Sequence, residues 1–267
     1  MNALTLSVVD GWTITKRNAL KIRRSPDLLG AAVMFPIVFV LMFVYVFGSV
    51  IHVPGMSYRE FLIPGIFVQA VIMGAQTTGY TLTLDLQKGI YDRFRSLPMA
   101  RSAVLIGQTV SDLLMNLAGL VVMAVVGLVV GWRVHSSPVE AVLGFGLLLL
   151  FAYAFSWVTA SVALSLRTPE SFSNIATMVS FPLMFISNAY LDSSKLPTPL
   201  RVVAEWNPIS TFTQAARELF GNTSPALKTS DAWPMRHAVP ASMLWIAVIL
   251  VVFVPLATRL YKKAVSS

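Results

Sequence analysis

Six long stretches of this 267-residue chain contain no Asp, Glu, Lys or Arg, and this feature limits the possible folds more than any other. Each holds about 20 residues or more, enough for a helix rising 1.5 Å per residue to cross ~30 Å of hydrocarbon. Backbone groups in lipid must bond within their own segment, so helices are expected. The sequence therefore predicts an all-α membrane protein with one transmembrane domain over residues 1–267. Its spans are placed at about 28–51, 61–84, 102–132, 141–166, 171–191 and 238–258, the third extended back past Asp112.

The composition excludes several classes of protein. Hydrophobic residues make up 56% of the chain and charged residues 12%, whereas about a quarter of a soluble domain is charged. The chain has no cysteine, which excludes disulfides, thiol chemistry and cysteine-based metal sites. No G-x-x-x-x-G-K-[ST], H-E-x-x-H or G-x-S-x-G motif occurs, and the three histidines are scattered. We therefore expect no ATP hydrolysis, no metal site and no enzymatic activity in this chain.

The distribution of positive charge predicts the orientation in the membrane. With the termini and alternate loops on one side, that side collects thirteen of the 20 Lys and Arg residues, and five of the other seven lie in the long 192–237 loop. Because Lys and Arg accumulate in short cytoplasmic loops, both termini are expected in the cytoplasm and the 192–237 loop outside. The net charge of +8 is then expected to face anionic lipid headgroups rather than nucleic acid.

Residues 1–27, before the first span, show an amphipathic pattern. Leu4, Val8, Trp12 and Thr15 recur every three or four residues, and the basic residues lie largely elsewhere. No apolar region with a small-residue cleavage site is present, so a removable signal peptide is not expected. The pattern predicts an interfacial helix that lies on the membrane with a tryptophan anchor.

One sizeable loop, 85–101, is expected on the cytoplasmic side between spans. On a helix, Ile90, Phe94 and Leu97 share one face, and Pro98 ends the element. Two interpretations are open: a solvated loop whose basic residues only set the orientation, or a short amphipathic helix that binds a protein. The mixture of acidic and basic residues around an apolar face favours the protein partner.

The stretch LQKGIYDRFRSLPMARSAVLIGQ, Leu86–Gln108, resembles the loop after the second span in ABC-2 type permeases, the membrane subunits of one class of ATP-binding-cassette exporters. Within that class its K-G-x-x-D-R-F-R-S-L-P-x-x-R run is most similar to the daunorubicin-resistance membrane subunits of actinobacterial drug exporters. The resemblance implies a coupling helix that seats in a groove of a separate ATPase subunit and transmits its closure to the spans. By position, the implied contacts are Lys88, Gly89, Asp92, Arg93, Arg95, Leu97, Pro98 and Arg101.

The resemblance also implies an assembly and a role. The chain is expected to pair with an identical copy or a close paralogue, and with two ATP-binding subunits that hold the ATP and Mg²⁺, while it binds no cofactor itself. The amphipathic leader would then touch the ATPase, lipid alone being the other interpretation. The expected cargo is a hydrophobic drug or antibiotic, or a lipid or glycolipid, exported across the plasma membrane of a bacterium. An ion-coupled secondary carrier is the alternative, disfavoured because no ionisable residue is expected at mid-membrane.

Several polar side chains fall inside the predicted spans, where they need partners or water. Gln69 and Gln76 are seven residues apart and share a helix face, as do Asn174 and Thr177 at three apart. Hydrogen bonding between helices and lining of a substrate pathway both explain them. The candidates are Gln69, Gln76, Thr77, Asn116, Asn174, Thr177 and Ser180.

The outer loop contains the helix pattern EWNPISTFTQAARELFGN. Asn207 suits the N-cap, Pro208 the first helical position and Gly221 the helix end. An N-P followed by A-x-R-x-x-x-G is similar to ABC-2 permeases at this point, which adds Arg217 to the resemblance. We expect a well-capped surface helix rather than a ligand site.

Overall fold

The computed structural model describes residues 34, 37–89, 101–166, 168–227 and 230–266, with backbone only for 101–111, 262 and 264–266. Within these ranges the ordered segments are helices, and the single bridge between Val53 and Met56 forms no strand. The all-α membrane class is thereby confirmed. The elements are a helix at 37–42 that continues as the π-helical turn η1 (Phe43–Phe47), α3 (Tyr58–Gln87), α5 (Arg101–Val130), α6 (Pro138–Leu164), α7 (Pro169–Phe185), η2 (Ser193–Lys195), α8 (Thr198–Trp206), α9 (Pro208–Phe220), α10 (Trp233–Arg236) and α11 (Ala238–Ser266).

Four helices in the described part of the chain are long and apolar enough to cross a membrane: Tyr58–Gln87, Asp112–Val130, Pro138–Leu164 and Ala238–Tyr261. α7 has 17 residues and ends at Phe185, six residues before the predicted limit of the fifth span. The chain turns there, between Ile186 and Tyr190. Part of the first predicted span lies outside the described residues, and its helical part is Ile37–Phe47.

Capping residues fix where three of the long helices begin. The backbone N–H of Ser57 donates to Glu60 Oε2 at the start of α3 (3.1 Å), and Ser137 makes the same reciprocal box with Glu140 at the start of α6 (2.9 Å). The Thr168 hydroxyl accepts the backbone N–H of Ser171, and proline follows at the first position of α7. These boxes satisfy backbone donors that the first helical turn leaves free.

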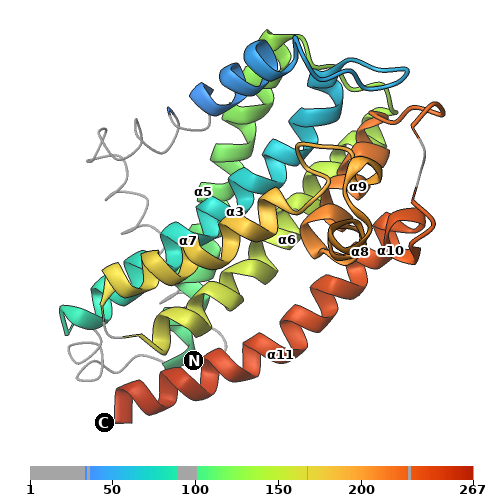
Figure 1. Ribbon diagram of the computed structural model, residues 1–267. Helices are drawn as coiled ribbons and strands as arrows, with labels where there is room; N and C mark the ends of the chain where they lie inside the picture. The colour runs from blue at the N-terminus through green and yellow to red at the C-terminus, as the bar shows by residue number, and fades with distance from the viewer. Residues whose placement is uncertain (1–33, 35–36, 90–100, 167, 228–229, 267) are drawn as a thin grey trace.

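α3 is the central helix of the bundle, packed against α5, α6, α7 and α9 (Figure 1). The buried Phe67 ring of α3 packs edge to face against Trp132 and Phe220, at 5.2 and 5.9 Å between ring centroids. In Figure 1 the short helices α8, α9 and α10 gather at one end of the bundle. The last turn of α3 and the C-terminus of the chain lie together at the opposite end.

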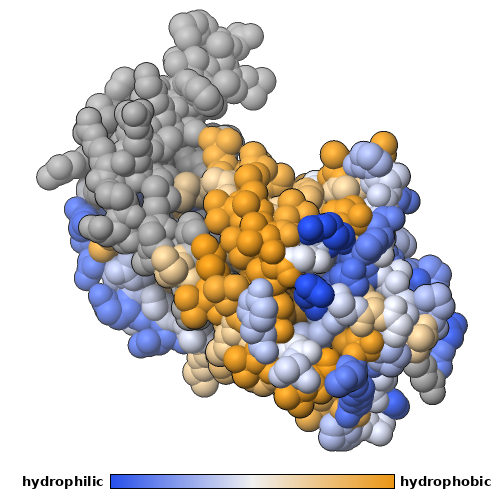
Figure 2. Space-filling model, turned by 90° about the horizontal axis from the view of Figure 1, so that it is seen from above, coloured by the Kyte–Doolittle hydropathy of each residue, from blue (hydrophilic) through white to orange (hydrophobic). Residues whose placement is uncertain are grey.

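The surface is hydrophobic around the middle of the molecule. Figure 2 shows hydrophobic residues across the centre of the face it presents, with hydrophilic residues on both sides towards the ends of the bundle. Much of this exposed apolar surface belongs to the helices that are long enough to cross a membrane. α5, for example, exposes Val121, Val125 and Val129. An apolar band of this kind is what a bilayer covers.

Candidate functional site

The C-terminal end of α3 leads directly into the predicted coupling loop. Lys88 is exposed and caps the helix, and Gly89 follows with φ +63°, its N–H donating to Leu86 O (3.0 Å). This left-handed conformation is one that glycine adopts without the steric cost of a Cβ. The structure therefore places these two residues where the chain leaves the bundle. Asp92, Arg93, Arg95, Leu97 and Pro98 lie outside the described residues, and Arg101 begins α5 with only its backbone described.

The last turns of α3 are packed into a cluster with the three other helices at this end. The Phe172 ring of α7 is buried and lies against Gly79, so closely that a Cβ there would collide with it. The other members of the cluster are Leu82, Trp157, Ala160, Ala163, Ala257 and Tyr261. A displacement of the loop at Gly89 would consequently be transmitted to α7 through the contact between Gly79 and Phe172.

Along the α3–α7 interface, three of the predicted polar residues form hydrogen bonds between segments. Gln76 Nε2 of α3 donates to the Ser180 hydroxyl of α7 (2.7 Å). Gln69 Oε1 accepts from the hydroxyl of Tyr190, in the turn after α7 (2.6 Å). Both bonds join the two elements, which is the interhelical use of polar groups expected in a membrane.

The other four predicted polar residues are not brought together. Asn116 is buried, donates to Asp112 O in its own helix (2.9 Å) and packs against Gly74 of α3. Thr77 is exposed and donates to Met73 O one turn back (3.2 Å). Asn174 and Thr177 are exposed on α7, and their side chains make no hydrogen bond within the described part of the chain.

α7 has an open face around these two polar residues. Among the described elements it packs mainly against α3 and, more lightly, against α6. Large apolar side chains are exposed beside Asn174 and Thr177; they are Ile175, Met178, Val179, Phe181 and Phe185. A mixed polar and apolar face on a helix of the bundle indicates a surface that something other than lipid covers.

At the end of the bundle where α8, α9 and α10 gather, α9 forms as its capping pattern indicates. Asn207 Oδ1 accepts the backbone N–H of Ile209 (2.9 Å), and Pro208 occupies the first position. The helix ends at Gly221, whose φ is +70° and whose Cβ, if it had one, would lie 2.6 Å from Ser136 N. The amide of Asn207 also donates to Leu183 O of α7 (2.6 Å), which joins the two helices.

The expectation of a surface helix is wrong, because α9 is inserted among α3, α6 and α11. Its Phe212 stacks on Phe151 of α6 at 3.9 Å between centroids. Phe151 lies ten residues inside the predicted fourth span, or about 15 Å along the helix at 1.5 Å per residue. The chain therefore enters the bundle through α8, turns at Asn207 and returns through α9 as an inserted hairpin. The small residues Ser210, Thr211, Thr213 and Ala215 allow this burial on sides that an apolar stripe does not cover.

Arg217 holds this hairpin to the neighbouring segments at the same end of the bundle. The side chain is buried, donates through Nε to Phe61 O (2.9 Å) and through Nη2 to Asn188 O and Ala189 O (2.7 and 3.3 Å). Its guanidinium lies 3.6 Å from the centroid of the Phe61 ring. Because guanidinium groups stay protonated in proteins, Arg217 is a buried cation. One cation thus ties α9 to the start of α3 and to the turn after α7.

Sequence reasoning missed a run of aromatic rings that joins the first helix to the turn after α7. Phe39 stacks on Phe43 at 4.4 Å, Phe43 lies 5.1 Å from Tyr190, and Tyr190 lies 5.5 Å from Phe185. Phe181 continues the run at 4.5 Å from Phe185. The spacing of four residues within 39–43–47 and 181–185 was the available signal, since residues four apart share a helix face.

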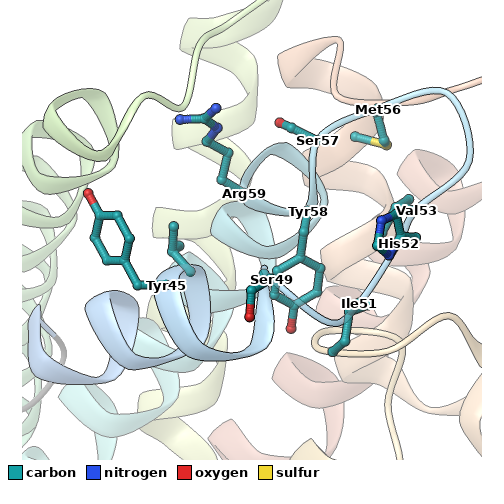
Figure 3. Close-up of a pocket in the computed structure, with 11 residues that line it drawn as sticks. Tyr45, Ser49, Ile51, His52, Val53, Met56, Ser57, Tyr58 and Arg59 are labelled. Atoms are coloured by element: carbon teal, nitrogen blue, oxygen red, sulfur yellow. The ribbon is translucent and has the colours of Figure 1, made fainter.

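A cavity of about 420 Å³ lies between the end of η1 and the start of α3, with Tyr45, Ser49, His52, Tyr58 and Arg59 in its lining (Figure 3). Arg59 donates to Val130 O (3.2 Å), and Figure 3 shows its guanidinium and His52 on opposite sides of the hollow. The polar groups therefore do not converge on one point. Within the described residues no group of three or more His, Cys, Asp or Glu side chains is placed to hold a metal ion.

Comparison with known proteins agrees with these features. Residues 10–220 match the family model described as ABC-2 type transporter. The chain is 31% identical over 246 residues, 92% of its length and 83% of the relative's, to "Daunorubicin resistance ABC transporter permease protein DrrB1" of Streptomyces coeruleorubidus. It is 25% identical, over 90% of its length and 84% of the relative's, to "Doxorubicin resistance ABC transporter permease protein DrrB" of Mycobacterium tuberculosis. It is also 25% identical, over 79% of its length and 73% of the relative's, to "Putative transport permease ycf38" of Porphyra purpurea.

Proposed function

This chain belongs to the ABC-2 type transporter family, and we propose that it is the membrane-spanning subunit of an ATP-driven exporter of a hydrophobic or amphiphilic, drug-like compound. Two relatives carry names that refer to daunorubicin and doxorubicin resistance, which supports a compound of that kind as cargo. A separate ATP-binding subunit holds ATP and Mg²⁺, since this chain has no phosphate-binding motif. The chain lies in a bacterial plasma membrane with both termini in the cytoplasm.

The observation that carries the proposal is the open face of α7. Asn174 and Thr177 are exposed there among large apolar side chains. Polar groups at membrane depth are costly when lipid covers them, so they favour a neighbouring protein surface or a pathway. A second permease copy, identical or a close paralogue, fits this face across a two-fold axis. The cargo would then pass between the facing copies of α3 and α7.

Contacts along α3 and α7 support the way in which ATP closure reaches the pathway. The predicted coupling loop begins at Gly89, and α3 meets α7 first at Gly79–Phe172 and then at Gln76–Ser180. Further out, Leu183 O accepts from Asn207 of the inserted hairpin. Force applied by two ATP-binding subunits to the loops would therefore tilt α7 and pull on the outer end together.

Reconstitution tests the proposal. The chain is purified with the ATP-binding subunit that accompanies it, placed in liposomes, and ATP-dependent accumulation of doxorubicin is followed by its fluorescence. Transport is expected to need ATP and both subunits. Asn174→Leu and Thr177→Val are expected to lower transport without loss of assembly, whereas Met178→Leu on the same face serves as the control.

Other outcomes identify the alternatives. Uptake that follows an ion gradient with no ATP-binding subunit present would show a secondary carrier. ATP hydrolysis stimulated by a lipid or glycolipid but not by doxorubicin would support an ATP-driven exporter whose cargo is a lipid rather than a drug. Unaltered transport in both polar variants would remove the α7 face from the pathway.

A further inference from the structure

The loop between α5 and α6 is bonded to the end of α9. The backbone N–H of His135 donates to Phe220 O (2.9 Å), and the hydroxyl of Ser136 donates to Leu219 O (2.6 Å). Gly221 lies so close that a Cβ on it would be 2.6 Å from Ser136 N. These contacts fix the position of the loop relative to α9.

The side chain of His135 reaches from this loop to the first turn of α3. Its Nε2 lies 2.8 Å from Glu60 Oε1, which is hydrogen-bond distance. The other carboxylate oxygen of Glu60 accepts the backbone N–H and the hydroxyl of Ser57, in the box that begins α3 (3.1 and 2.8 Å). His135 therefore joins the end of α9, through its backbone, to the start of α3, through its ring.

The other titratable or charged side chains at these ends of the surrounding elements are each hydrogen-bonded to a group other than the His135 ring. They are Tyr58 and Arg59 on α3, Arg133 in the loop itself, Glu140 on α6, and Arg217 and Glu218 on α9. Arginine stays protonated in proteins, and tyrosine ionises only near pH 10. Histidine, in contrast, gains or loses its proton between about pH 5 and 8. Of the bonds that tie α3 to this end, the one between His135 and Glu60 therefore responds to pH in that range.

We propose that His135 and Glu60 form a proton-sensitive clasp between α9 and α3. The His135 side chain is 53% exposed, so protons reach it from solvent, and the Glu60 side chain is 21% exposed. A neutral imidazole donates an ordinary hydrogen bond to a carboxylate, whereas an imidazolium donates a charge-assisted one, which is stronger. Acid therefore tightens the clasp and alkali loosens it. On the predicted topology this loop lies outside the cell, so the clasp responds to external pH. The inference does not depend on the proposed transport function.

Hydrogen exchange of the purified protein in detergent micelles, followed by mass spectrometry, tests the clasp. Wild type and His135→Gln are compared with each other at about pH 5 and again at about pH 8, so the intrinsic pH dependence of exchange cancels. Glutamine can donate a hydrogen bond to Glu60 but takes up no proton. At the lower pH, peptides that cover 131–137 and 57–62 should exchange about 2- to 5-fold more slowly in the wild type, as expected of a partly exposed ion pair. At the higher pH the two proteins should exchange alike.

Two further variants assign the effect to this pair. Glu60→Gln removes the negative charge but keeps the box that begins α3, since glutamine serves at this position as glutamate does; it should abolish the difference between histidine and glutamine at position 135. His52→Gln is the matched control, because the His52 ring lies 3.3 Å from Val50 O rather than beside a carboxylate, and it should exchange like the wild type at both pH values. The same ratio of rates at the two pH values would overturn the proposal. So would a pH-dependent ratio that persists with Glu60→Gln, or an equal loss of slowing in His52→Gln.

Discussion

Replacing Gly65 by alanine tests the contact that seats the turn after α7 on α3. A Cβ at this position would lie 2.6 Å from Ala189 O and 3.0 Å from Ala189 Cα. Both neighbours are backbone atoms, so no side-chain rotation relieves the collision. The turn is also held from the other side by Arg217, which donates to Asn188 O (2.7 Å), so it cannot move away without loosening that bond.

Three opposing free-energy contributions decide whether Gly65→Ala stabilises or destabilises the protein. Alanine in place of glycine within a helix favours folding by about 1 kcal/mol. Overpacking of a tight contact costs about 1–3 kcal/mol, and weakening a hydrogen bond from a charged donor costs about 1.5–3 kcal/mol. The sum predicts that Gly65→Ala lowers the free energy of unfolding by about 1.5–5 kcal/mol, which corresponds to a fall in Tm of roughly 3–20 °C for a chain of this size.

Thermal unfolding of the purified protein in detergent micelles measures the effect. Two matched controls are Gly119→Ala in α5 and Gly146→Ala in α6, where an added Cβ meets nothing within 4 Å. These should leave Tm unchanged or raise it slightly. If Gly65→Ala proves as stable as the controls, the close seating of the turn on α3 is wrong, and so is the role given to Arg217 in holding it.

Three further experiments address the other contacts. Arg217→Lys keeps the charge but loses the planar fork that reaches three carbonyls, so a loss of about 3 kcal/mol in the free energy of unfolding is expected, and wild-type stability would mean that charge alone suffices. A double-mutant cycle of Gln76→Leu and Ser180→Ala should give a coupling free energy of about 0.6–2 kcal/mol, and zero coupling would show that the bond carries nothing. Gly89→Ala forces a Cβ into the left-handed region at a cost of ~1 kcal/mol, so it should reduce cargo-stimulated ATP hydrolysis in the complex while expression is maintained. Gln87→Ala, at the exposed last residue of α3, is the matched control, and equal hydrolysis in the two variants would contradict a lever that begins at Gly89.

The sequence predicted the long helices because a hydrocarbon layer imposes one length and excludes charge. It also located α9, since Asn207, Pro208 and Gly221 are local capping signals that act over a few residues. Its depth could not be predicted in the same way. α9 carries Ser210 and Arg217 on buried positions, and each becomes acceptable only through a partner far along the chain, the Asn188 N–H (2.9 Å) and the Phe61 carbonyl (2.9 Å) respectively. Such pairings depend on tertiary packing, which periodicity does not record.

The polar residues of the spans divide for a similar reason. Gln69 and Gln76 share a helix face in the sequence pattern, and both do face the α7 side of α3 in the structure. The pattern could not reveal that Asn174 and Thr177 share a face of α7 that is left open. Whether a helix face is covered depends on the helices packed around it. The spacing of polar residues along the sequence is the same for a covered face and for an open one.

The unequal packing of α6 and α7, two of the helices that contact α3, indicates which of them a displacement of the coupling loop would move. α6 is enclosed by α3, α5, α9 and α11, and its Phe151 is stacked against the inserted hairpin. α7 is attached to α3 at Phe172 and Ser180, lies only lightly against α6, and has a face around Asn174 and Thr177 that no other described element covers. Local free energies of displacement follow the apolar contacts that must be broken. A push on the end of α3 would therefore shift α7 at lower cost than α6, and because Leu183 and Asn188 of that segment are held by Asn207 and Arg217, the same shift would reach the hairpin at the opposite end of the bundle.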